Sequence, residues 1–276
     1  MFIANTDKDI QALLADIGVS SFEELVAQIP AEFLKAKFDL PPALTEIELK
    51  KHIAELACAN KKMLNFAGAG AYEHFIPAGV NALAGRGEFT TAYTPYQAEA
   101  SQGTLQTIYE FQSSICALFD MDVANASMYE AATALVESIT ATLKITSRNK
   151  VLIPQALNPH YKKTIETYFQ NNPQVKIEEI PCTDGTIDEK EFSALLDEDT
   201  ACVVLANPNF YGCIENAQEI SDKTHGNKSL LIAVVNPISL ALLTPPGQYD
   251  ADFAIAEGQP LGNALNYGGP YLGIFT

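Results

Sequence analysis

The sequence predicts an α/β protein built around a mainly parallel sheet. Over the second half of the chain, short apolar and β-branched runs alternate with helical segments. Strands with such continuous apolar character are buried on both faces, and the helices between them form the crossovers of a parallel sheet. The composition agrees, because 47% of the 276 residues are hydrophobic and only 18% are charged, which excludes intrinsic disorder.

The first sixty residues predict three short helices, each opened by a Ser or Thr with an acidic residue three positions later. That spacing favours a capping box. The pairs are Thr6 with Asp9, Ser21 with Glu24, and Thr45 with Glu48. Gly18 and Pro30 end the first two helices. The third helix follows the Pro41-Pro42 break and is expected to turn its apolar side chains inward; these are Leu49, Ile53 and Leu56.

Residues 65–104 differ in character, with clustered Gly, Pro, Tyr and Thr and little periodicity. Irregular segments of this length in a compact domain are usually functional. Two helices are predicted next, at 101–119 and 129–146. The strands predicted after them are 151–153, 175–180, 202–205 and 230–235, with helices at 160–169, 188–196 and 215–223. Ligands are expected beyond the carboxyl ends of these strands.

Charge and composition exclude several classes of function. The 34 acidic and 17 basic residues give a net charge of −17, which argues against binding to nucleic acids or anionic membranes. No secretory signal is expected from the first residues, and the longest apolar stretch, 230–243, is interrupted by Asn236 and Pro237. The five dispersed cysteines indicate a soluble protein of the reducing cytoplasm, and the four histidines show no metal-ligand spacing.

Three segments are candidates for function. Thr91–Gly103 crowds polar and aromatic side chains before a helix, which favours either a binding loop or simple packing with Ser101 as the helix cap. Asn125–Ala134 leads into a helix whose N-terminus could seat a phosphate, but Glu130 in its first turn would repel one. Ala256–Gly273 is rich in glycine and contains no nucleotide-binding motif.

These three segments, together with Phe66–Val80 and Ala206–Glu215, resemble the glycine cleavage system P-protein family, specifically its N-terminal half or subunit 1, over essentially the whole chain. The resemblance implies an aspartate-aminotransferase-like large domain (PLP fold type I) at 63–276, behind an N-terminal helical arm at 1–62. It also implies decarboxylation of glycine, release of CO2 and transfer of the aminomethyl group to the lipoyl arm of H-protein. Family chains continue into a smaller C-terminal domain, so this chain is expected to be a fragment that is inactive alone.

The resemblance leads us to look for the lysine that would hold pyridoxal phosphate as a Schiff base. In this fold that lysine follows the later strands, but residues 229–276 contain no Lys or Arg. Asn236 follows the last predicted strand, where a carboxylate normally pairs with the pyridine nitrogen. We expect that Ser127, Met128 and Asn236 are vestigial cofactor positions and that subunit 2 of a cytoplasmic heterotetramer holds pyridoxal phosphate.

Sites in this fold lie at subunit interfaces, so the chain could complete the pocket of subunit 2. The candidates for this role are Tyr93, Thr94, Tyr96, Gln97, Glu99 and Ser101, with Tyr72 and His74 as weaker ones. Glu99 or His74 could move a proton, although a lone loop Glu is more often solvated or capping. Two alternatives remain: a non-catalytic scaffold or regulatory subunit, and a self-sufficient pyridoxal-phosphate enzyme, which the missing lysine opposes. Because the chain has few basic residues, it offers no obvious binding surface for an acidic H-protein, whose docking surface could lie on subunit 2.

Overall fold

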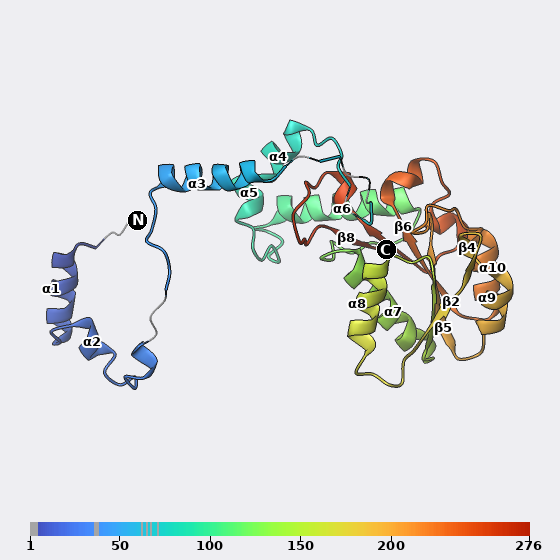
Figure 1. Cartoon of the computed structure of the whole chain (residues 1–276), viewed down its shortest axis with the longest axis horizontal. Helices are drawn as coiled ribbons and strands as arrows, with labels where there is room; N and C mark the ends of the chain where they lie inside the picture. The colour runs from blue at the N-terminus through green and yellow to red at the C-terminus, as the bar shows by residue number, and fades with distance from the viewer. Residues whose placement is uncertain (1–4, 36–38, 62, 65, 67, 71) are drawn as a thin grey trace. The chain divides into compact units, whose positions relative to one another are not determined.

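The computed structural model describes residues 5–35, 39–61, 63–64, 66, 68–70 and 72–276 (Figure 1). The chain divides into two compact units, Met1–Leu64 and Asn65–Thr276. The larger unit contains the whole sheet.

The N-terminal unit consists of short helices with local caps. They are α1 (Asp7–Ile17), α2 (Phe22–Leu25), the 3-10 turn η1 (Phe33–Lys35) and α3 (Glu46–Ala59). The capping boxes predicted for α1 and α3 are confirmed. In α2, Ser21 caps the N–H of Glu24, but the carboxylate of Glu24 accepts from Ser20 at 2.9 Å (N–H) and 2.6 Å (hydroxyl). The predicted box at α2 is therefore only half correct, because Ser20 provides two donors to that carboxylate.

The apolar side chains of α3 are not packed inward. Leu49, Ile53 and Leu56 are each about half exposed, and Leu14 of α1 is the only buried residue among those described in this unit. Within this unit they meet no core, because its described residues form none that could cover them; the expectation that they pack on a domain or on a partner subunit stays a prediction.

The larger unit begins with helices and continues as an alternation of strands and helices. Its helices are α4 (Ala78–Ala84), α5 (Gly87–Thr90), α6 (Gln102–Phe119), α7 (Ala131–Thr146), α8 (Pro159–Phe169), α9 (Glu189–Leu195) and α10 (Ala217–Gly226). The 3-10 turns are η2 (Pro237–Ala241), η3 (Pro246–Tyr249) and η4 (Gln259–Leu261). The region 65–104 is thus less irregular than predicted, since it holds α4 and α5.

The sheet has six strands in the order β2-β1-β5-β6-β7-β8. They are β1 (Lys150–Pro154), β2 (Lys176–Ile180), β5 (Thr200–Ala206), β6 (Leu230–Val235), β7 (Phe253–Glu257) and β8 (Gly273–Phe275). All neighbours pair in parallel except β7 and β8, which are antiparallel. The four predicted strands are present. The sequence pattern did not predict β7, β8 or the small hairpin of β3 (Cys182–Thr183) and β4 (Thr186–Ile187).

Helices cover both faces of the sheet (Figure 1). Along β5, Cys202, Val204 and Ala206 belong to one core with residues of α7 and α8. Val203 and Leu205 belong to a second core with residues of α6, α9 and α10. The alternation of side chains along each strand explains why the strand sequences are apolar throughout. Within the described ranges, no helix is both long and apolar enough to cross a membrane.

Candidate functional site

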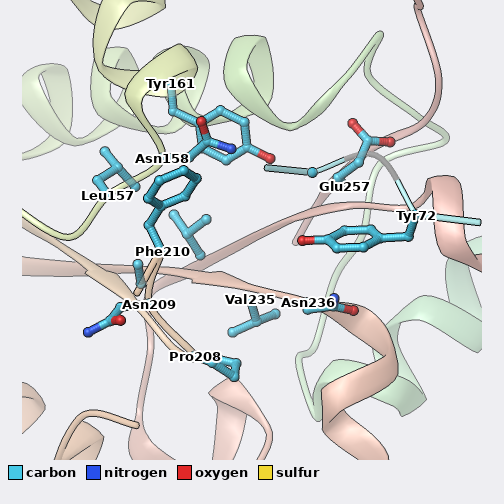
Figure 2. Close-up of a pocket in the computed structure, with 13 residues that line it drawn as sticks. Tyr72, Leu157, Asn158, Tyr161, Pro208, Asn209, Phe210, Val235, Asn236 and Glu257 are labelled. Atoms are coloured by element: carbon cyan, nitrogen blue, oxygen red, sulfur yellow. The ribbon is translucent and has the colours of Figure 1, made fainter. Parts of the chain in front are cut away.

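A cavity of about 100 Å³ lies at the carboxyl ends of the parallel strands (Figure 2). Its wall includes Val235 at the end of β6, Glu257 at the end of β7 and Ala206 at the end of β5. This is the sheet edge where parallel α/β folds place their ligands, as expected from the sequence. Side chains from elsewhere in the sequence complete the wall. The polar and aromatic ones include Tyr72, Asn158, Tyr161, Phe210 and Asn236.

The connection from β1 to α8 provides one side of the cavity. Asn158 caps α8, since its side-chain oxygen accepts the N–H of His160 at 2.9 Å. The Nδ2 of Asn158 also donates to the carbonyl of Ala69 at 3.3 Å, which holds the glycine-rich segment before Tyr72 against α8. One turn further along α8 is Tyr161, whose pKa is raised by burial and further by the negative charge of Glu257. Tyr161 was not predicted as a site residue.

Gln259, which is fully buried, fixes the position of Tyr72. Its Oε1 accepts the N–H of Tyr72 at 3.2 Å, and its Nε2 donates to the carbonyl of Tyr72 at 3.0 Å and to that of Asn263 at 2.8 Å. Tyr72, one of the two weaker candidates from the sequence, therefore lies at the cavity. His74 lies beside it but outside the cavity lining, with Nδ1 3.1 Å from the carbonyl of Tyr72 and with Nε2 buried without a partner.

Asn236 lines the cavity immediately after β6, at the predicted vestigial position. Its Oδ1 accepts the N–H of Ile238 at 3.0 Å and so caps the turn η2. The amide is neutral and cannot offer the negative charge that would pair with a protonated pyridine nitrogen.

The N-terminus of α7 is occupied by carboxylates of the chain itself. Glu130 is the N-cap residue rather than a member of the first turn, and its Oε2 accepts the N–H groups of Ala132 at 3.0 Å and Thr133 at 3.3 Å. The remaining N–H, that of Ala131, donates to Glu257 at 3.3 Å. The helix is therefore capped by its own Glu130, with a second carboxylate from β7.

Glu257 joins three parts of the fold. Besides the N–H of Ala131, it accepts those of Gln259 at 3.0 Å and Leu272 at 3.2 Å. Burial raises the pKa of Glu257, the three N–H donors oppose that rise, and the charge of Glu130 adds to it. Sequence analysis missed Glu257 because β7 was not predicted; the signal available was a carboxylate that directly follows the apolar run 253–256.

Two other predicted vestigial positions, Ser127 and Met128, do not line the cavity. Met128 exchanges both backbone hydrogen bonds with Gly273, at 2.7 and 2.9 Å, and so extends the sheet beside β8. Ser127 precedes this bridge and is exposed. The chain therefore reaches α7 through a strand-like pairing with β8.

The loop candidates between Tyr93 and Ser101 also lie away from the cavity. Tyr93 is 96% exposed and Tyr96 is 85% exposed. Thr94, Gln97 and Glu99 belong to the same stretch of turns before α6. Ser101 is the N-cap residue of α6, but its side chain makes no capping hydrogen bond, so the expected side-chain cap is absent. It lines a separate hollow with residues of α5 and α6.

No group of three or more His, Cys, Asp or Glu side chains within the described ranges is arranged to hold a metal ion. The described cysteines are free thiols. The chemistry available at the cavity is therefore that of one buried carboxylate, tyrosine hydroxyls and side-chain amides.

Comparison with known proteins places this chain in a family. The glycine cleavage system P-protein family matches residues 1–276. A probable glycine dehydrogenase (decarboxylating) subunit 1 from Chlorobium phaeobacteroides is 46% identical over the full chain, which spans 63% of the length of that relative.

Solved structures agree with this assignment. The crystal structure of a glycine decarboxylase (P-protein) of the glycine cleavage system, in inhibitor-bound form, matches with a TM-score of 0.91 and 38% identity; the match covers all of this chain and 62% of that one. A sphingosine-1-phosphate lyase from Burkholderia pseudomallei, 12% identical, shares the fold over 91% of this chain and 61% of its own, with a TM-score of 0.64. The predicted fold class, the aspartate-aminotransferase-like large domain of PLP fold type I, is confirmed. The chain belongs to the glycine cleavage system P-protein family.

Proposed function

We propose that this chain acts within subunit 1 of a two-subunit glycine decarboxylase, where it completes the pocket of a subunit 2 that carries pyridoxal phosphate. The assembled enzyme decarboxylates glycine, releases CO2 and transfers the aminomethyl group to the lipoyl arm of H-protein. Family membership and the name of the curated relative support this proposal. When bound, pyridoxal phosphate supplies an electron sink for the carbanion left by decarboxylation.

The observation that carries the assignment of the cofactor to the partner is the pair of carboxylates at α7. In anion sites of α/β folds, the free N–H groups of a helix N-terminus hold the phosphate. Here Glu130 and Glu257 already accept those N–H groups, and their charges would repel a phosphate. Residues 229–276 contain no lysine for a Schiff base, and Asn236 takes the place of the expected acid. Pyridoxal phosphate does not fit the groups that this chain offers.

We propose that the loop from Tyr93 to Ser101 lines the pocket of the partner. Two nearly fully exposed tyrosines in one short loop are unfavourable in isolation but suit an interface, where tyrosine combines apolar area with a polar tip. Glu99 is the better proton-transfer candidate, because its side chain is exposed, whereas Nε2 of His74 is buried and its Nδ1 contacts the carbonyl of Tyr72. Thr94, Gln97 and Ser101 would orient polar groups of the substrate.

We further propose that H-protein docks mainly on the partner. The net charge of −17 leaves this chain few basic residues with which to recognise an acidic carrier surface. The same charge does not disfavour glycine, which is small and zwitterionic.

The test is H-protein-dependent exchange of labelled bicarbonate into glycine, measured with the full-length subunit 1, with subunit 2, and with their mixture. Activity only in the mixture is expected. Exchange by subunit 1 alone with added pyridoxal phosphate would overturn the assignment of the cofactor to the partner. Equal activity of subunit 2 alone and of the mixture would favour a scaffold or regulatory subunit instead.

A further inference from the structure

The cavity at the carboxyl ends of the strands has the lining of a cation site. Three aromatic rings from separate parts of the chain border it: Tyr72 from the segment before α4, Tyr161 from α8 and Phe210 from the loop after β5. Figure 2 shows the hydroxyls of Tyr72 and Tyr161 pointing into the space between them. Among the described lining residues none is Lys, Arg or His, whereas Glu257 is a carboxylate.

The hydrogen-bond donors that usually attract an anion to this sheet edge are already used. Glu130 and Glu257 together accept the N–H groups of the first three residues of α7. The amide oxygens of Asn158 and Asn236 already accept backbone N–H groups, so the polar groups left for a ligand include the carboxylate of Glu257 and the two phenolic hydroxyls. A charged ligand in the cavity would meet one carboxylate and no basic side chain, which favours a positive charge.

The charge of Glu257 is only partly balanced. The side chain is half-buried, no basic side chain pairs with it among the residues that contact it, and Glu130 adds repulsion. A cation in the cavity would offset this charge and could also lie against the faces of the aromatic rings, which attract cations.

We propose that this cavity binds a small organic ammonium ion. A cavity of about 100 Å³ has room for a small ammonium group. Amino acids, glycine included, are excluded because their carboxylate would face Glu257 without a basic partner. The ammonium group could belong to a free amine or to a lysine side chain of another subunit. The proposal does not depend on the glycine decarboxylase assignment.

The test is a calorimetric titration of the purified protein with tetramethylammonium chloride, which cannot form a Schiff base with any pyridoxal phosphate in the assembly. Tert-butanol serves as the neutral control and sodium acetate as the anionic one, at constant ionic strength. We expect saturable binding near one site per chain for the cation and none for the controls. The proposal would be overturned if the cation bound neither to the free chain nor to the assembly, or if acetate bound more tightly than the cation.

Variants test whether binding occurs at this cavity. Glu257→Gln should weaken binding at least about tenfold, and Phe210→Leu by several-fold, through loss of the charge and of one ring respectively. Phe210→Leu keeps the proposal testable if Glu257→Gln destabilises the fold. Glu166→Gln, on the exposed side of α8, is the matched control and should bind as the native protein does. Unchanged binding in both cavity variants would contradict the assignment.

The two sources of the ammonium group are distinguished by measuring the free chain and the assembly separately. Binding in both indicates a free amine as the natural ligand. Binding to the free chain that disappears in the assembly indicates that a lysine of another subunit fills the cavity.

Discussion

Glu130 and Glu257 divide the N-terminal amides of α7 between them. Glu257 accepts the N–H of Ala131 at 3.3 Å, and Glu130 accepts those of Ala132 and Thr133 at 3.0 and 3.3 Å. The two carboxylates thus act as internal anions at a helix end that would otherwise attract an external one. An arriving phosphate would have to displace both.

Replacement of both residues, Glu130→Ala with Glu257→Ala, should open an anion site. Loss of Glu257 alone leaves three amide donors without their acceptor and should lower the free energy of unfolding by about 1–3 kcal/mol. Inorganic phosphate should then raise the melting temperature of the double variant more than that of the native protein. The measurement is a thermal melt in phosphate and in chloride of equal ionic strength.

The control for this prediction is Glu166→Ala, which removes an exposed carboxylate from α8 and so changes the net charge by one without touching α7. Phosphate should affect this variant as it affects the native protein. An equal phosphate effect in the double variant and in Glu166→Ala would show that these amides do not form an anion site when vacated.

The titration of Glu257 should make stability depend on pH in an unusual direction. Because burial raises its pKa above the ordinary value of 4.5, the folded state binds this proton more tightly than the unfolded state does. The extra stability is present below 4.5 and is lost as the pH rises through the folded-state pKa. The test is urea denaturation of the native protein and of Glu257→Gln at several pH values. As the pH falls, the free energy of unfolding of the native protein should rise relative to that of the variant.

Asp197 provides the opposite sign for comparison. A hydrogen bond from Lys150 at 2.9 Å lowers the pKa of Asp197 below 3.8, so its contribution to stability is present above that pH and is lost as the pH falls through the lowered value. The advantage of the native protein over Asp197→Asn should therefore shrink in acid. A Glu257→Gln difference that also shrinks in acid would contradict the predicted sign.

Local features of the fold could be predicted from the sequence, and long-range ones could not. The boxes at Thr6 and Thr45 were predictable because both partners lie within four residues. The four apolar strands identified the parallel sheet and hence the edge where the cavity lies. Glu257 was missed because its partner Ala131 lies 126 residues away in sequence. The strand β8 has only three residues and follows a glycine-rich loop, so its sequence is too short to show the alternation of apolar and polar residues that predicts a strand.

Replacement of Gln259 by Leu should release Tyr72 from the cavity wall. Gln259 is fully buried and holds both backbone groups of Tyr72, so its loss leaves these groups without partners and should cost about 1–3 kcal/mol of stability. Hydrogen exchange of the Tyr72 amide should accelerate relative to amides in β5. Gln218→Leu, at an exposed position of α10, is the matched control and should leave exchange at Tyr72 unchanged.

Substitutions in the loop from Tyr93 to Ser101 should separate pocket completion from scaffolding. Tyr93 and Tyr96 are 96% and 85% exposed, so Tyr93→Ala and Tyr96→Phe should change the stability of this chain by less than about 0.5 kcal/mol. If the loop lines the pocket of the partner, bicarbonate exchange by the assembled enzyme should fall about tenfold or more in these variants and in Glu99→Gln, while the subunits stay associated in gel filtration. Tyr168→Phe, an exposed tyrosine of α8, is the control expected to keep native activity. Native activity in all three loop variants would instead favour a scaffold or regulatory role, because a loop that touches substrate or cofactor cannot lose a phenol ring, a hydroxyl or a carboxylate without effect on turnover.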